Sequence, residues 1–125
     1  MLHTLRLSIV NVYLLTGDKA ILIDAGGPGD VPRILTFMKE HGVEPGHLSL
    51  IVATHGHWDH AGGAAQLRAE TKAPIAIHRG DLELARQGIN GAAKPTCLTG
   101  YFVRLFINRG YPKFEQIVAS LAPKN

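Results

Sequence analysis

Four side chains of the types that bind metal ions lie within six consecutive residues of the stretch THGHWDH, residues 54 to 60. They are His55, His57, Asp59 and His60. Residues two apart on an extended backbone point to the same side, so His55 and His57 can approach one cation together. Asp59 and His60 can face an adjacent point at the start of the next helix. Imidazoles and a carboxylate are ligands of zinc, and also of iron and manganese, so the loop predicts a metal site.

The residues of this loop alone leave two alternatives to a catalytic metal site. One is a polar surface loop with chance histidines, although the apolar run 50–53 before it and the glycines after it favour a built site. The second alternative is a structural zinc site. Such a site requires cysteines or a closed shell of four ligands, and the chain has a single cysteine, Cys97.

The stretches around the loop alternate between strand-like and helix-like patterns, which is typical of a layered domain of the α/β or α+β class. Alternation and β-branched residues predict one long strand over residues 5–15, and Gly17-Asp18 predicts the turn into a second strand. Helical spacing predicts a helix that Asp30 caps at its N-terminus. The second strand covers 20–23, and we expect further strands over 48–53 and 74–78 and helices over 31–42, 64–70, 81–87 and 114–121. The apolar run 98–107 fits either a helix or a strand, and we favour a helix.

The motif THGHWDHAGG resembles the His-x-His-x-Asp-His signature of the metallo-β-lactamase superfamily, and is most similar to its glyoxalase II-like hydrolases. The stretch NVYLLTGDKAILIDAGGPG resembles the opening hairpin and Asp-x-Gly-like turn of that family. The stretch APIAIHRGDLELA resembles the strand and helix after its metal loop. The resemblance covers most of residues 5–88.

The resemblance implies an α+β fold, the αββα metallo-β-lactamase-like sandwich, of which this chain holds one half as a mixed sheet with flanking helices. Carried over by position, His55 and His57 bind a first metal ion, while Asp59 and His60 bind a second. Asp59 is also the candidate catalytic residue, and Asp24 orients the loop by hydrogen bonds. The expected cofactor is one or two zinc ions, with iron or manganese as alternatives. In the family, water activated by the metal attacks an electrophilic carbonyl or phosphorus.

The chain departs from the family after this loop. The second half of the family fold supplies further histidines and a bridging aspartate, whereas here His60 is followed only by His78, and Asp59 only by Asp81. His78 is kept as a possible extra ligand, although the end of a strand favours a structural or surface role. Asp81 fits a helix N-cap better than a ligand. Residues 1–125 therefore predict a single truncated domain with an incomplete site.

A half domain leaves one sheet face without cover, and something should cover it. We expect a homodimer or another partner there; the apolar C-terminal segments folding back, or a fragmentary gene product, are the alternatives. The expected function is a metal-dependent hydrolase of thioesters, lactones or other small-molecule esters, active if a second chain supplies the missing ligands. The alternative is a non-catalytic half-domain module for metal binding or interaction.

A nuclease-like member is a third hypothesis. Residues 63–125 carry nine Lys/Arg against four Asp/Glu, whereas residues 1–62 carry four against six. The cations are scattered singly, which argues against a nucleic-acid partner. The remaining totals fit one cytoplasmic domain: 125 residues, of which 46% are hydrophobic, with no secretion-type N-terminus. No stretch approaches the roughly 18 apolar residues that a membrane-spanning helix requires.

Overall fold

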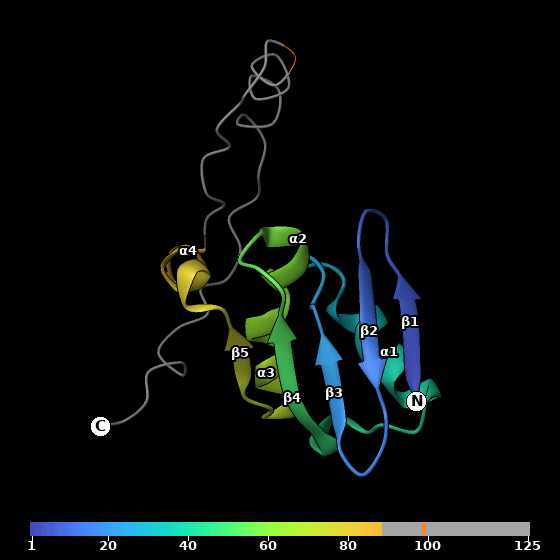
Figure 1. Cartoon of the computed structure of the whole chain (residues 1–125). Coiled ribbons are helices and arrows are strands. Elements are labelled where there is room, and N and C mark those ends of the chain that lie inside the picture. The colour runs from blue at the N-terminus through green and yellow to red at the C-terminus, as the bar shows by residue number, and fades with distance from the viewer. Residues whose placement is uncertain (89–98, 100–125) are drawn as a thin grey trace, which may run out of the picture.

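In the computed structural model, a five-stranded sheet in the order β1-β2-β3-β4-β5 forms the centre of the described part of the chain, residues 1–88 and residue 99 (Figure 1). β1, β2 and β3 pair in antiparallel fashion. β4 pairs parallel to β3, and β5 parallel to β4, so the sheet is mixed. The strands are β1 (Leu2–Arg6), β2 (Asn11–Leu15), β3 (Ala20–Ile23), β4 (Leu48–Ala53) and β5 (Ile75–Ile77).

The single long strand predicted over residues 5–15 is wrong, because the chain reverses within it. β1 and β2 form a hairpin in which Arg6 lies opposite Asn11. The turn is closed by the Leu7 amide, which donates to the Val10 carbonyl at 2.9 Å. The turn residues are Ser8 and the exposed Ile9. This turn lacks the glycine, proline or asparagine that marks most turns, so the apolar pattern runs through it without a break.

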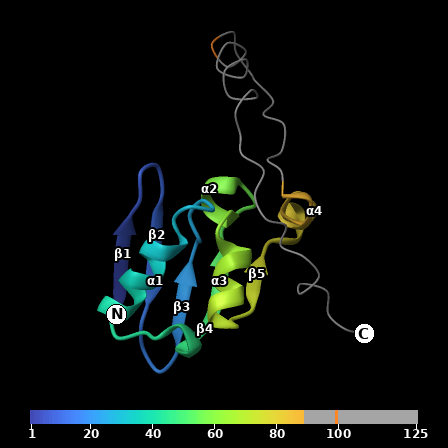
Figure 2. The same cartoon turned by 180° about the vertical axis from the view of Figure 1, so that it is seen from behind.

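The helices predicted within residues 1–88 are confirmed, with one addition. α1 (Val31–Glu40) and α3 (Ala64–Thr71) cover the same face of the sheet (Figure 2). The addition is α2 (Trp58–Ala61), a short helix inside the histidine loop. The remaining elements are α4 (Leu82–Gln87) and the 3-10 turns η1 (Pro45–His47) and η2 (Arg79–Asp81). No helix in this part of the chain is long and apolar enough to span a membrane. The helices predicted over 98–107 and 114–121 lie outside the described residues.

The hydrophobic core lies between the sheet and the two helices behind it. Alternate residues of β2, Val12 and Leu14, are fully buried, as is Leu22 of β3. They face Ile34 and Met38 of α1, which follow the helical spacing and are also fully buried. Such burial is worth roughly 1.5–3 kcal/mol for each large side chain. The core therefore sets the position of the sheet edge at which the histidine loop begins.

The opposite face of the sheet is apolar, and within residues 1–88 no helix lies over it (Figures 1 and 2). The strand register places one side chain beside the next across β2, β3 and β4. These side chains are half-buried, or exposed in the case of Leu15, whose exposed fraction is 40%. We call this surface the open sheet face; its residues are Leu15, Ile21, Ile23, Leu50 and Val52.

The close approach of two loops at Gly63 provides a test of this packing. A Cβ atom at Gly63 would lie 2.4 Å from the Ala25 carbonyl oxygen, so backbone must shift to admit it. We expect Gly63→Ala to lower the free energy of unfolding by about 1–3 kcal/mol, the usual cost of overpacking. Urea denaturation measures this. Gly46→Ala is the control, because nothing lies within 4 Å of its added Cβ; equal stability of the two variants would contradict the assigned packing.

Candidate metal centre

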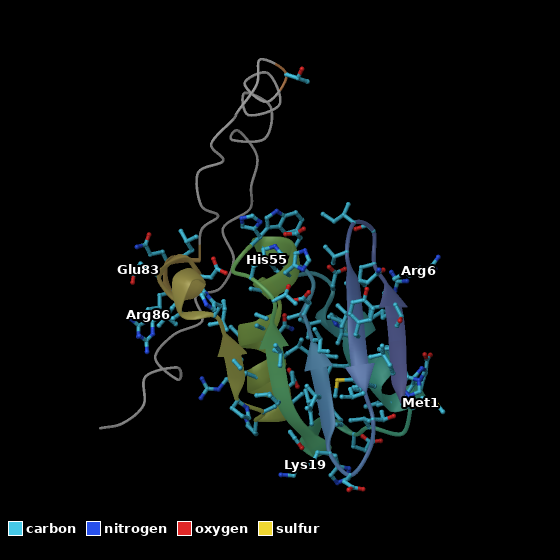
Figure 3. The ribbon with its side chains drawn as sticks, viewed as in Figure 1. Met1, Arg6, Lys19, His55, Glu83 and Arg86 are labelled. Atoms are coloured by element: carbon cyan, nitrogen blue, oxygen red, sulfur yellow. The ribbon has the colours of Figure 1, made fainter. Side chains whose placement is uncertain are left out.

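The candidate site lies at the edge of the sheet where the parallel strands end. Because β3, β4 and β5 run in one direction, the residues that follow them meet there: Asp24 after β3, His55 shortly after β4, and His78 after β5. Figure 3 shows His55 at this upper edge, above β4. Ligands in sheets with parallel strands commonly bind beyond the carboxyl ends of the strands.

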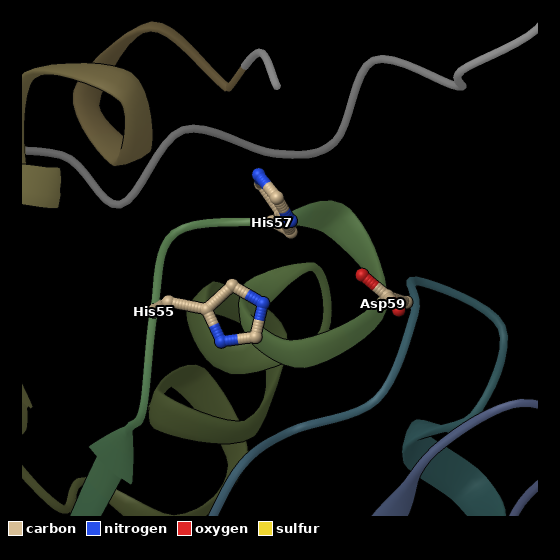
Figure 4. A group of neighbouring side chains, drawn as sticks. All are labelled: His55, His57 and Asp59. Carbon is tan, nitrogen blue, oxygen red and sulfur yellow. The ribbon is translucent and has the colours of Figure 1, made fainter. Parts of the chain in front are cut away.

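Three of the four predicted ligands lie close enough together to share one ion. One ligand atom from each of His55, His57 and Asp59 lies within 4.8 Å of the others. His55 lies in the loop after β4, His57 immediately precedes α2, and Asp59 is in its first turn (Figure 4). Donor atoms around one tetrahedral zinc ion are about 3.4 Å apart, given bonds of about 2.1 Å. Small rotations of these side chains would suffice, so the donor set fits a metal ion.

His60 lies beside this group but is held by another residue. Its Nδ1 is 2.8 Å from Oδ2 of Asp24, while its Nε2 is 3.6 Å from Oδ2 of Asp59. An ionised carboxylate only accepts hydrogen bonds, so Nδ1 of His60 carries a proton, and Nε2 is the nitrogen that the neutral ring would offer to a metal ion. The ring centroids of His60 and His55 are 4.0 Å apart. His60 can therefore present Nε2 toward the site, and its role as a ligand stays a prediction.

The carboxylate of Asp24 organises the loop from below. Asp24 is 3% exposed and accepts hydrogen bonds from the Thr54 amide at 2.8 Å and the Thr54 hydroxyl at 2.9 Å, besides that from His60. The same hydroxyl lies 3.1 Å from Nδ1 of His55. Because Thr54 donates its proton to Asp24, it accepts from His55, which leaves Nε2 of His55 for a ligand. One buried carboxylate thus orients both rings.

The environment of His55 keeps its ring in the metal-binding form. Burial is the main cause that lowers the pKa of His55 below its usual value, and the positive charges of His60 and His57 act in the same direction. The nearby carboxylates of Asp24 and Asp59 oppose this shift only in part. A lowered pKa keeps the imidazole neutral in mildly acidic solution, where an exposed histidine is protonated.

The glycine-rich loop after Asp24 packs directly under α2. The Ala25 amide donates to the His60 carbonyl at 2.7 Å, and the Gly63 amide to the Gly26 carbonyl at 3.1 Å. A Cβ atom at Gly27 would lie 2.8 Å from the ring of Trp58, so the indole rests on this glycine. Because glycine has no side chain, the two loops touch through their backbones, a contact that the sequence could indicate only by its glycines.

Asp30 lies at the N-cap position of α1, as predicted, but its side chain makes no cap hydrogen bond to the helix. Instead its Oδ2 accepts from the Gly27 amide at 2.9 Å. The predicted cap of α1 by the Asp30 side chain is therefore wrong, because this carboxylate stabilises the glycine loop beside the site instead. An Asx-type hydrogen bond to a nearby loop amide competes with capping at such positions.

His78 and Asp81 lie outside the group of three ligands. Nδ1 of the exposed His78 accepts from the Gly80 amide at 3.1 Å, which caps η2. Asp81 precedes α4 without a side-chain cap hydrogen bond. Its backbone lies close to the histidine loop, since a Cβ atom at Gly56 would lie 3.2 Å from the Asp81 carbonyl oxygen. This contact accounts for the glycine that separates the two histidines.

A cleft of about 500 Å³ opens beside the site, and sequence reasoning missed it. One wall is formed by Asp24 and His60, and the other by the β1–β2 hairpin. The hairpin itself was hidden by the continuous apolar pattern, so no signal in the sequence placed Arg6 or Asn11 next to the metal loop. The lining residues are Arg6, Leu7, Ser8, Ile9, Val10, Asn11, Tyr13, Asp24 and His60.

Comparison with known proteins agrees with this geometry. The family model of the metallo-beta-lactamase superfamily matches residues 5–93, more than half of the chain. The chain belongs to the metallo-beta-lactamase superfamily. The probable metallo-hydrolase YqgX of Bacillus subtilis is 31% identical to this superfamily member over 81 residues, covering 64% of the chain and 36% of the relative. Hydroxyacylglutathione hydrolase of Anaeromyxobacter dehalogenans is 36% identical over 89 residues, covering 70% and 32%.

Solved structures of the superfamily share the fold. Rm3 metallo-beta-lactamase superposes with a TM-score of 0.73 at 25% identity, covering 91% of this chain and 39% of that one. A metallo-beta-lactamase of Cronobacter sakazakii gives 0.66 at 28% identity, covering 70% and 34%. The chain thus spans about a third of the length of these superfamily members. The fold expected from the resemblance, a mixed sheet with flanking helices as part of that sandwich, is confirmed.

Replacing Asp24 tests whether it orients the site. In Asp24→Asn the NH2 group replaces one carboxylate oxygen that accepts from Thr54 or His60. We therefore expect the free energy of unfolding to fall by about 1–3 kcal/mol. Metal affinity should fall by a factor of roughly 10 to 100, as for other residues that hydrogen-bond to ligands. Urea denaturation and competition with a chromogenic chelator measure the two effects. Asp18→Asn at the exposed β2–β3 turn is the control; if both variants bind metal alike, Asp24 has no orienting role.

Proposed function

We propose that this chain is the metal-binding half of a metal-dependent hydrolase that cleaves a thioester, lactone or other small-molecule ester. The observation that carries the proposal is the grouping of His55, His57 and Asp59 within 4.8 Å of one another. These residues lie at the sheet edge beside a cleft large enough for a small substrate. Hydroxyacylglutathione hydrolases among the relatives support a thioester as one candidate substrate.

The chain's own residues would prepare the site for the ion. His55 and His57 offer neutral nitrogen donors, and Asp59 adds a carboxylate that is also our candidate catalytic residue. Asp24 fixes the tautomers of His55 and His60, so both present Nε2. Zinc is the first candidate, with iron or manganese as alternatives. A bound ion would supply Lewis-acid chemistry, which polarises an ester carbonyl and activates water.

We further propose that a second polypeptide, in the simplest case a second copy, completes the site and covers the open sheet face. Three ligands from one loop leave coordination positions open. The matched segment spans only 36% and 32% of two superfamily relatives, which supports a missing complement. Apolar sheet faces of this kind are covered in stable proteins. Without such a complement, residues 1–125 would act as the alternative, a non-catalytic half-domain module.

Removing one proposed ligand tests the metal site. We expect His57→Ala to lose the bound ion, because two remaining donors hold a divalent cation weakly. Elemental analysis after dialysis against zinc-containing and then zinc-free buffer measures occupancy. His47→Ala is the matched control, since His47 is an exposed histidine in η1. Full occupancy in His57→Ala would contradict the assignment.

The oligomeric state and activity can be measured on one sample. We expect a zinc-loaded dimer that hydrolyses a simple thioester, since the second copy would supply cover for the open sheet face. Light scattering gives the mass, elemental analysis the metal content, and release of free thiol the activity. A metal-free monomer without hydrolysis would support the non-catalytic module and overturn the hydrolase.

A further inference from the structure

The positively charged side chain of Arg6 lines the cleft beside the metal centre, and the proposed hydrolysis gives it no role. Arg6 ends β1 and lies directly opposite Asn11 at the start of β2. Residues paired across strands place their side chains on the same face, and Tyr13 lies on that face two residues after Asn11. All three residues line the cleft together with Asp24 and His60.

The polar groups of this wall are free to meet a ligand. Within residues 1–88, Arg6 forms no ion pair. Asn11 and Tyr13 are joined only by a long contact, 3.4 Å from Nδ2 to the phenol oxygen. By contrast, Asp24, the carboxylate of the cleft, is already engaged by Thr54 and His60. Arg6 is therefore a cation whose charge no carboxylate of the described residues neutralises.

The remaining hairpin wall is apolar except for Ser8. Leu7, Ile9 and Val10 come from the hairpin turn, and the side chain of Ile9 is 67% exposed. The cleft thus combines one guanidinium, the neutral hydrogen-bonding groups of Ser8, Asn11 and Tyr13, and a short apolar surface, with Asp24 and His60 at its opposite wall.

We propose that Arg6 determines specificity for a substrate that carries a free carboxylate separated from the scissile ester or thioester by a short apolar spacer. The guanidinium would bind the carboxylate through two parallel hydrogen bonds, a geometry that suits arginine better than lysine. Asn11 and Tyr13 donate to the remaining lone pairs. The hairpin turn contacts the spacer, and the ester carbonyl is directed toward His60 and the metal ligands. This inference rests on the proposed hydrolase function.

A monoanion fits this wall better than a phosphate group. Of the described residues, Arg6 is the one cationic side chain that lines the cleft, and Asp24 lines its other wall, so the second charge of a phosphate dianion would have no partner among the lining side chains. Inorganic phosphate is therefore the competitor that separates the two chemistries.

Binding is tested first, on the full chain with zinc and again after chelation, so that coordination of the ion by the probe is separated from contact with Arg6. The probes are succinamate, which has one carboxylate and one amide, and the neutral succinamide. NMR titration should show succinamate binding to the hairpin and succinamide binding at least tenfold more weakly. Arg6→Gln should lower the affinity for succinamate about ten- to hundredfold, in line with loss of a charged hydrogen bond. Arg6→Lys should recover part of the loss.

Lys19→Gln is the matched control, because Lys19 is an exposed cation at the opposite end of the sheet (Figure 3). It changes the net charge equally and should leave succinamate binding unchanged. Equal weakening by Lys19→Gln, or no weakening by Arg6→Gln, overturns the assignment of Arg6. Phosphate binding as tightly as succinamate overturns the choice of a carboxylate.

Kinetics then separates this inference from the hydrolase itself. The substrates are monophenyl succinate and its uncharged methyl ester. We expect Arg6→Gln to raise KM for the anionic ester about tenfold or more and leave KM for the neutral ester unchanged. Equal effects on both esters overturn the specificity role while hydrolysis stands. If neither ester is cleaved but succinamate binding depends on Arg6, the proposed hydrolase function is overturned, while the assignment of Arg6 as a carboxylate-binding residue is supported.

Discussion

The hydrogen bonds of the buried Asp24 carboxylate are the interaction on which the candidate centre depends. Asp24 adopts a backbone φ of +64°, a left-handed conformation unusual for a residue other than glycine. That conformation turns the chain at the end of β3, and the side chain accepts from Thr54 and His60. Burying a carboxylate is costly unless its lone pairs are satisfied. The bonds that offset this cost also set the tautomers of His55 and His60, so loop geometry and ligand chemistry share one cause.

The sequence predicted most elements within residues 1–88, since these depend on local patterns, whereas the candidate ligands stay predictions, of which the structure groups His55, His57 and Asp59. The helical spacing of apolar residues in α1 reflects burial of one face of the helix, and the apolar run of β4 reflects a strand within the sheet. Each pattern can be recognised from its own short stretch of sequence. The hairpin at Ser8 and Ile9 was missed because Ser8 is its only residue of a turn-favouring type, and a serine between Leu7 and Ile9 also fits the alternation of a continuing strand. The engagement of Asp30 with Gly27 rather than with α1 was missed because it depends on where the glycine loop lies after folding. The cleft beside the metal loop was missed together with the hairpin that forms its wall.

The glycines around α2 show how closely the loop after Asp24 packs against the histidine loop. Side chains at Gly27 and Gly63 would meet the Trp58 ring and the Ala25 carbonyl. Backbone hydrogen bonds between Ala25 and His60 and between Gly26 and Gly63 replace side-chain packing there. Protein interiors resist small displacements because they are densely packed. The ligand loop is therefore supported by rigid backbone contacts, while the cleft side of the centre is lined by a hairpin that extends beyond the sheet (Figure 1).

The three grouped ligands, His55, His57 and Asp59, span only five residues of the chain. An ion held by them closes a very short loop and links no distant segments, unlike the zinc ions that hold small domains together. The long-range link is made by Asp24, which reaches Thr54 across 30 residues without any metal. Hence the sheet and its core owe their stability to the carboxylate and the packed helices, and the ion contributes little to the fold. Within residues 1–88, loss and uptake of metal can then occur on a folded domain and need reorder no more than the ligand loop.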